Sequence, residues 1–218
     1  MDQQTHQQLA AQLRMPVGEE GIRTGEWMNR GNVHINLDTI EILNAIEGNN
    51  ILEIGMGNGY FVKDILQNVN HVQYTGVDFS AVMVEEAKKL NAAWIYKGQA
   101  KFILSNAAAL PFADATFNKI FSINTIYFWD DPAAILAEIK RVLQPKGRLI
   151  VALRPKRLMK NYPFTQYGFT MYTREEVIQL LTTNGLIITQ AIEKQEPDFE
   201  LNGEMVKIEN LIIEAVNG

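Results

Sequence analysis

The chain has 218 residues, a formal net charge of −5, 47% hydrophobic residues and no cysteine. This length and composition are typical of one soluble globular domain. Without cysteine there can be no disulfide framework and no thiolate metal site. The acidic balance, with an isoelectric point near 5.3, disfavours tight non-specific binding to nucleic acid, which needs a basic surface.

The sequence indicates neither a membrane-spanning segment nor a metal site. The densest apolar run, LIVAL at 149–153, has the length of a strand and falls short of the roughly 20 residues of a membrane span. Residues 1–14 lack the apolar segment of a signal peptide. The histidines are scattered, at His6, His34 and His71. We therefore expect a cytoplasmic protein with no metal, no membrane and no nucleic-acid partner, of open oligomeric state.

In chain order, residues 1–30 are polar and contain glycine, so we expect them to be partly mobile. Residues 34–46 carry apolar side chains at helical spacing. After Gly48, short apolar runs alternate with helix-like segments at 59–68, 80–93 and 131–143. The predicted strands are NILEI (50–54), HVQYTGVD (71–78), AKFIL (100–104), FNKIFSI (117–123) and GRLIVAL (147–153). This alternation indicates βαβ units and a parallel sheet with helices on both faces.

The C-terminal part has well-marked boundaries and a different pattern. Asp131 followed by proline predicts a helix start, Thr173 with Glu176 a capping box, and Gly185 a helix end. Two strands are predicted, GLIITQAIE (185–193) and KIENLIIEAV (207–216), and Asn202-Gly203 between apolar flanks is a two-residue hairpin signal. The sheet is therefore predicted to begin parallel and to close with an antiparallel hairpin.

A glycine-rich turn follows the first strand, with the spacing Glu53-x-Gly55-x-Gly57-x-Gly59. Such a turn lets the backbone approach a ligand, and the next helix points its free N–H groups at the same space. The dinucleotide fingerprint needs a third glycine at position 60, which is tyrosine, and the phosphate-binding Gly-Lys-Ser/Thr is absent. The turn therefore resembles a nucleotide-binding turn but carries neither of the two phosphate-binding motifs.

Two carboxylates indicate which chemical groups the expected ligand carries. Glu53 at a strand end would repel a pyrophosphate but suits an ammonium group. Asp78 ends the next strand, 19 residues beyond Gly59, where a carboxylate can accept both hydroxyls of a ribose. Together they predict a ligand with a ribose and a positively charged amino-acid end, and no phosphates.

These motifs, with LPFADATFNKIFSINTIYFWDDP and LQPKGRLIVAL after them, resemble class I S-adenosylmethionine-dependent methyltransferases, closest to the small-molecule group of the methyltransferase domain 11 type. The resemblance covers about residues 48–216. It implies an α/β, Rossmann-like seven-stranded sheet, mostly parallel with an antiparallel C-terminal hairpin and helices on both faces. It also implies one domain over residues 1–218. Within it we expect a helical cover (1–47), a cofactor-binding core (48–154), a lid-like insertion (155–172) and a C-terminal helix and hairpin (173–218).

The resemblance further implies S-adenosylmethionine as cofactor and S-adenosylhomocysteine as product. The three glycines would line the methionine end, Glu53 would hold its ammonium, Asp78 the ribose, and Phe79 would pack beside the adenine. Asn106 stands where the family often has an acidic residue contacting the adenine amino group, and its amide oxygen can accept that hydrogen bond. The expected cofactor-binding residues are Glu53, Gly55, Met56, Gly57, Asn58, Gly59, Asp78, Phe79, Met83, Asn106, Ala107 and Asn124.

Methyl transfer from a sulfonium is an in-line displacement that needs no nucleophile on the enzyme, so alignment and exclusion of water are the protein's main contributions. No catalytic residue is assigned; His34 and Tyr127 are candidate proton acceptors. The basic, aromatic stretch 154–173 could form a lid that favours an anionic or aromatic acceptor, or its cations could be solvated while its aromatics pack it down. The substrate-pocket candidates are Met28, Asn32, Trp129, Tyr162 and Tyr167.

We therefore predict a methyltransferase that acts on an unidentified small-molecule acceptor. One alternative is a non-catalytic domain that binds the cofactor as a sensor or partner subunit. A second is an NAD-dependent oxidoreductase, which residues 53 and 60 disfavour.

Overall fold

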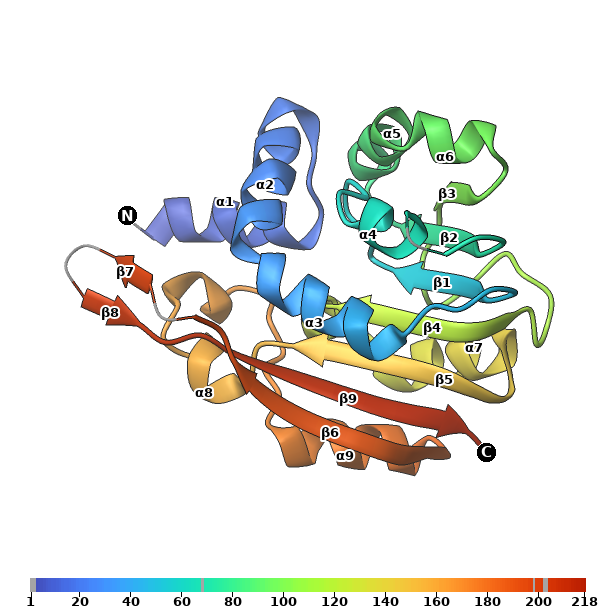
Figure 1. The fold of residues 1–218 in the computed structure, drawn as a ribbon. Coiled ribbons are helices and arrows are strands. Elements are labelled where there is room, and N and C mark those ends of the chain that lie inside the picture. Colours follow the sequence, from blue (N-terminus) through green and yellow to red (C-terminus); the bar gives the residue numbers. More distant parts are fainter. Residues whose placement is uncertain (1–2, 68, 198, 202–203) are drawn as a thin grey trace.

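A seven-stranded sheet forms the centre of the computed structural model, which describes residues 3–67, 69–197, 199–201 and 204–218 (Figure 1). Its strand order is β3-β2-β1-β4-β5-β9-β6. The strands are β1 (Asn50–Ile54), β2 (Gln73–Asp78), β3 (Ala100–Leu104), β4 (Phe117–Ile123), β5 (Leu143–Leu153), β6 (Leu186–Gln195) and β9 (Glu209–Asn217).

The sheet is parallel from β3 to β5, and β9 runs antiparallel between β5 and β6. Leu149 of β5, for example, pairs with Ala215 of β9. The predicted mixed sheet, mostly parallel with an antiparallel C-terminal pair, is thereby confirmed.

The predicted hairpin turn at Asn202-Gly203 lies outside the described residues. The strands that flank it, β7 (Phe199–Leu201) and β8 (Glu204–Val206), pair antiparallel in a separate two-stranded sheet. The antiparallel pair at the end of the main sheet is β6–β9, and the β7–β8 pair is separate from it.

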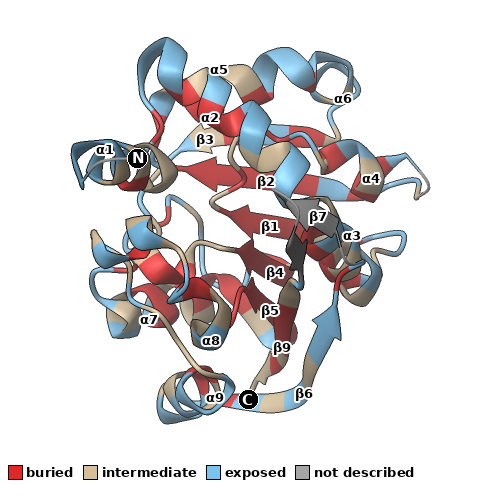
Figure 2. Ribbon diagram, turned by 90° about the vertical axis from the view of Figure 1, so that its left-hand side faces the viewer, coloured by how far each residue is buried: buried red, intermediate tan, exposed pale blue. Residues whose placement is uncertain are grey.

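Helices cover both faces of the sheet, as the alternating pattern predicted (Figure 2). One buried cluster lies under α7 and α9, and the other under α3, α4 and α5. The helices are α1 (Gln3–Arg14), α2 (Gly18–Gly31), α3 (Val33–Leu43), α4 (Val62–Leu66), α5 (Ala81–Leu90), α6 (Ala92–Tyr96), α7 (Pro132–Val142), α8 (Lys156–Met159) and α9 (Arg174–Thr183), with short 3₁₀ turns η1 (Ile126–Phe128) and η2 (Pro163–Gln166).

The predicted helix boundaries are confirmed by their hydrogen bonds. Asp131 caps α7 by accepting from the Ala134 N–H at 3.0 Å. Both bonds of the capping box at the start of α9 are present, and Gly185 after its end has a φ of +75°. Each cap satisfies N–H groups or carbonyls that a helix end leaves without an internal partner.

The helix predicted over 80–93 is broken at Asn91, because the buried Asn91 side chain donates to the carbonyls of Gly59 and Ala87. In the described part of residues 1–30, which we expected to be partly mobile, lie α1 and all but the last residue of α2. The turn between these helices is held to the sheet by the Ser80 hydroxyl, which donates to the Pro16 carbonyl at 2.6 Å.

None of the helices in the described residues is long and apolar enough to cross a membrane. Over the same residues there is no group of three or more histidine, aspartate or glutamate side chains that could hold a metal ion.

Candidate active site

A pocket of about 320 Å³ lies at the carboxyl ends of β1, β2, β3 and β4. Its walls are formed by the loops that follow these four strands, together with residues of α1, α2 and α3. Ligands of open α/β sheets bind in this position, where the strand order reverses on either side of the first strand. All twelve residues expected to bind the cofactor line this pocket.

The glycine turn has the backbone that glycine permits. Gly55, Gly57 and Gly59 have φ values of +75°, +56° and +65°. A Cβ on Gly55 would overlap the Thr125 methyl group, and one on Gly59 would lie 2.9 Å from the Asn91 amide nitrogen. A Cβ on Gly57 would meet nothing within 4 Å. The first and third glycines therefore permit close packing, while Gly57 leaves its side of the pocket open.

Asp78 ties the loop after β1 to the loop after β2. Its carboxylate accepts from the Gly57 N–H at 3.0 Å and from the Ser80 N–H at 2.8 Å. Burial raises the pKa of Asp78, and the backbone N–H groups of Ser80, Gly57 and Phe79 oppose that rise. These bonds fix the carboxylate at the pocket wall in one orientation.

Glu53, at the end of β1, is only 8% exposed. One carboxylate oxygen accepts from the buried Tyr74 hydroxyl. Burial raises the pKa of Glu53 to about 7; the Tyr74 hydrogen bond lowers it and the charge of Asp78 raises it. Among the described residues, no cationic side chain pairs with Glu53 or Asp78. A ligand that brings positive charge would therefore be stabilised beside them.

The loops after β2 and β3 supply an apolar edge and an amide. The Phe79 ring is 43% exposed although it lines the pocket, so it offers an uncovered flat surface. The Asn106 side-chain oxygen accepts from the Ala108 N–H at 2.9 Å in a local turn. This bond leaves the oxygen one lone pair for a ligand donor.

The loop after β4 meets the junction of α2 and α3. Asn124 has a left-handed backbone, with a φ of +57°, and its amide donates to the Asn32 side-chain oxygen at 3.2 Å. Met28, Asn32 and Trp129, three of the five substrate-pocket candidates, line the pocket. The α2–α3 junction therefore forms part of the pocket wall.

Comparison with known proteins agrees with this architecture. The model of a family described as a methyltransferase domain matches residues 52–151, which run from β1 through the glycine turn to β5. Residues 52–151 therefore form a methyltransferase domain. This match, with the strand order and the antiparallel β9, confirms the resemblance found in the sequence.

Two relatives of the methyltransferase domain differ in the reaction their names state. O-methyltransferase resE of Aspergillus sclerotiorum is 37% identical over 156 residues, which are 68% of this chain and 58% of resE. The ubiquinone/menaquinone biosynthesis C-methyltransferase UbiE of Desulfotalea psychrophila is also 37% identical, over 122 residues that cover 55% of this chain and 47% of UbiE. The chain thus spans about half the length of these curated relatives.

One solved structure matches almost the whole chain. It is the complex between the Haloferax volcanii Trm112 methyltransferase activator and a methyltransferase, with a TM-score of 0.76 and 17% identity. The match covers 97% of this chain and 98% of that one. At this identity, the comparison shows the fold of the methyltransferase domain, including its N-terminal helices.

The two candidate proton acceptors do not line the pocket of the methyltransferase domain. The Tyr127 ring is buried, and its hydroxyl bonds to the Arg154 backbone and, at 3.2 Å, to Asn124. Burial also raises the Tyr127 pKa. His34 lies on α3 with an exposed side chain. Tyr127 therefore supports the pocket residue Asn124 from behind.

The predicted lid residues Tyr162 and Tyr167 also lie outside the pocket lining. Tyr162 stacks on Phe164, with ring centroids 5.5 Å apart, and Phe169 packs against Phe128 at 4.6 Å. The aromatic side chains of 155–172 thus pack this segment onto the core, which is the alternative that the sequence left open.

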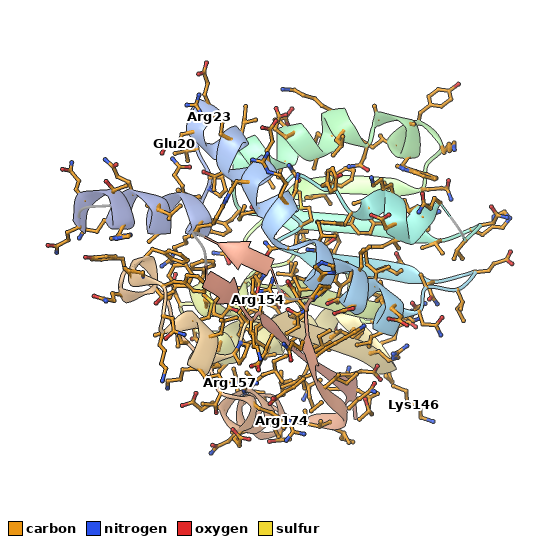
Figure 3. All side chains as sticks on the ribbon, turned by 60° about the vertical axis from the view of Figure 1, so that its left-hand side comes forward. Glu20, Arg23, Lys146, Arg154, Arg157 and Arg174 are labelled. Atoms are coloured by element: carbon orange, nitrogen blue, oxygen red, sulfur yellow. The ribbon has the colours of Figure 1, made fainter. Side chains whose placement is uncertain are left out.

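Three of the four cations of residues 154–173 have carboxylate partners, namely Arg154, Lys156 and Arg157. Arg154 is buried and pairs with Glu196, and Arg157 pairs with Glu193 and Glu209. In Figure 3, Arg154 lies in the crowded middle of the view and Arg157 nearer its lower edge. These paired side chains stabilise the fold. Their positions give no support to the prediction that they select an anionic acceptor.

A strap formed by residues 13–16, from the last two residues of α1 into the turn before α2, lines the pocket, and its contacts were not foreseen. Arg14 donates from Nη2 to both carboxylate oxygens of Asp130, at 2.8 and 2.7 Å, and the Pro16 carbonyl accepts from Ser80. Because β1 lies between β2 and β4, a strap bound to the loops after both strands spans the glycine turn. Its sequence is ordinary helix and turn, so no motif could have indicated it.

Proposed function

We propose that this protein transfers a methyl group from S-adenosylmethionine to a small-molecule acceptor. The observation that carries the proposal is the pair of buried carboxylates, Glu53 and Asp78, which face one pocket beside a glycine turn without a cationic partner among the described residues. Buried carboxylates of this kind are costly unless a ligand pairs with them. The methyltransferase domain and the names of its relatives support the same reaction.

The residues present fit this cofactor group by group. Glu53 would hold the ammonium of the methionine end, Asp78 would accept from the ribose hydroxyls, and the exposed face of Phe79 would pack on the adenine. Asn106 and the backbone of Ala107 would contact the adenine edge. When bound, S-adenosylmethionine supplies an electrophilic methyl group on a sulfonium. The open side of Gly57 leaves room for the ligand to lie against the turn.

The charges of the pocket affect the binding of both the cofactor and the methyl acceptor. Glu53, Asp78, Asp130 and Asp131 line it, and Arg14 is the one cation among the described residues that do, already paired with Asp130. This field stabilises a sulfonium and an ammonium and disfavours an anion. The acceptor is therefore a neutral or cationic small molecule.

The chain's contribution to the reaction is alignment and exclusion of water. The strap and the α2–α3 junction cover the carboxyl ends of the strands, so they would shield the reacting groups from solvent. The walls formed by Met28, Asn124 and Trp129 would orient the acceptor against the methyl group.

Calorimetric titration with S-adenosylmethionine, S-adenosylhomocysteine and NAD tests the ligand assignment. We expect micromolar binding of the two sulfur compounds and none of NAD. Binding of NAD alone would support the oxidoreductase alternative instead. Absence of binding by both sulfur compounds would overturn the proposal.

Turnover separates the enzyme from a non-catalytic cofactor-binding protein. Formation of S-adenosylhomocysteine is measured with a panel of acceptors, beginning with neutral hydroxyl compounds because resE is named an O-methyltransferase. Carbon acceptors are included because UbiE, at equal identity, is named a C-methyltransferase. We expect product with a neutral or cationic acceptor. Tight cofactor binding without any turnover across the panel would favour the sensor or partner-subunit alternative.

A further inference from the structure

The hydroxyl of Tyr74 is a buried polar group that the proposed function has not used. Tyr74 lies on β2 and is 1% exposed. Its hydroxyl donates to Glu53, and its ring lies 5.8 Å from that of Phe102. A phenylalanine would make the same ring contacts, so the hydroxyl adds its bond to the carboxylate.

The sheet is built to allow this bond. Glu53 pairs with Gly76 in the β1–β2 register, and Tyr74 precedes Gly76 by two residues, so their side-chain positions share one face of the sheet. A Cβ on Gly76 would lie 3.0 Å from the Tyr74 hydroxyl and 2.8 Å from Met56 Cγ. Gly76 therefore leaves the space through which the hydroxyl reaches Glu53.

We propose that Tyr74 is a positioning residue that holds Glu53 as an ionised carboxylate facing the ligand's ammonium group. This inference rests on the proposed function. A hydroxyl that donates to one carboxylate oxygen stabilises the charged form and leaves the other oxygen for the ligand.

The electrostatic surroundings show why Glu53 needs such a donor. Burial favours its neutral form, and Asp78 on the neighbouring strand adds a like charge. Arg14 and Asp130 line the same pocket but pair with each other. Burial and the charge of Glu53 raise the pKa of Tyr74 well above its usual range, so Tyr74 remains a donor throughout the pH range in which proteins are studied. Its hydrogen bond is the contact that opposes neutralisation of Glu53.

The test is the pH dependence of S-adenosylhomocysteine binding to Tyr74→Phe, measured by calorimetry between about pH 6 and 8.5. Loss of a hydrogen bond to a charged group predicts affinity about tenfold weaker near pH 7. The pH below which affinity falls should also move upward. Tyr172→Phe, which changes a half-buried tyrosine near Glu176 outside the pocket, is the matched control and should change neither quantity.

Two further variants keep the inference testable if Tyr74→Phe folds poorly. Replacement of Tyr74 by 3-fluorotyrosine keeps the ring and strengthens the donor, so the pH midpoint should move downward. In a Glu53→Gln background, Tyr74→Phe should have little further effect on affinity, because the two residues act through one contact.

The outcomes distinguish this inference from the proposed function. If the unmodified protein does not bind S-adenosylhomocysteine, the proposed function fails. If it binds, and Glu53→Gln weakens binding while both Tyr74 replacements leave the affinity and the pH midpoint unchanged, the role of Tyr74 alone is overturned.

Discussion

At the scale of single residues, the site depends on two carboxylates whose surroundings differ. Asp78 is held by backbone N–H groups from its own loop and from the glycine turn. Glu53 is held by a side chain from the neighbouring strand. The first is therefore fixed by the turns themselves, and the second by packing within the sheet.

Removing the Asp78 carboxylate should weaken cofactor binding strongly. Asp78→Ala would remove the two charge-assisted bonds that we propose to the ribose, and we expect a loss of about 2–4 kcal/mol, or about 30- to 1000-fold in affinity for S-adenosylmethionine. Asn106→Ala should cost only about 1 kcal/mol, because its bond is neutral. Calorimetry measures both, with Asp64→Ala on α4 as the control. Unchanged affinity in Asp78→Ala would show that this carboxylate does not hold the ribose.

The raised pKa of Glu53 predicts that the unliganded protein loses stability as the pH rises. The folded protein keeps this proton up to about pH 7, whereas the unfolded chain releases it near pH 4.5. The stabilisation is thus fully present below about pH 4.5 and is lost as the pH rises through 7.

This loss amounts to up to about 3 kcal/mol, of which about 2 kcal/mol falls between pH 5.5 and 8.5. Urea unfolding at these two pH values should show the decline in the unmodified protein and a smaller one in Glu53→Gln. Equal declines in the two proteins would contradict the assignment.

At the scale of elements, the strap connects α1 to the loops that follow β2 and β4. Its ion pair is open to solvent, since the Asp130 side chain is 81% exposed, so it contributes at most about 1 kcal/mol. A contact of that strength can hold the strap closed and still open readily for ligand exchange.

Charge reversal tests the strap. Arg14→Asp and Asp130→Arg should each speed dissociation of S-adenosylhomocysteine by up to about fivefold, the equivalent of about 1 kcal/mol. The double exchange should restore the original rate. Stopped-flow fluorescence can follow dissociation, because Trp129 lines the pocket. A double variant no slower than the two single ones would rule out the ion pair as the closing contact.

The capping box of α9 lies away from the loops that line the pocket. Thr173→Ala removes the cap that Glu176 completes, so we expect a loss of about 1 kcal/mol and a Tm lower by about 2–4 °C. Affinity for S-adenosylhomocysteine should not change. Thr183→Ala, at the other end of the same helix, should leave the Tm nearly unaltered. A similar drop in Tm for both variants would mean that the cap is not the cause.

At the scale of the whole molecule, Arg154 links distant parts of the chain. It pairs with Glu196 after β6, donates to Asn210 on β9, and donates to the Gly31 carbonyl at the end of α2. Arg154, Glu196 and Asn210 are all buried. This network ties the C-terminal strands to the helices that cover the pocket.

Breaking this buried pair should be costly. Glu196→Ala leaves the Arg154 charge buried without its carboxylate, and we expect a loss of about 3–5 kcal/mol in the free energy of unfolding. Glu193→Ala breaks an exposed pair with Arg157 and should cost less than about 1 kcal/mol. Urea titration measures the difference. Equal costs would show that burial of Arg154 does not govern the network.

The amino-acid sequence by itself determined the mixed sheet, the capped starts of α7 and α9, and the residues that line the pocket from the loops after β1 to β4. These features depend on short-range patterns. Alternation of apolar runs sets the strands, capping side chains mark helix ends within a few residues, and the glycine turn with Glu53 lies within one strand-to-helix connection.

Only the tertiary structure decided which distant side chains meet these motifs. Arg14 and Asp130 are 116 positions apart, and Tyr74 and Glu53 are 21 apart. Residues 154–173 were ambiguous because basic and aromatic side chains suit either a lid or a packed segment, and their partners Glu193, Glu196 and Phe128 come from other elements. Such contacts depend on strand order and register, which bring loops together irrespective of their separation in the chain.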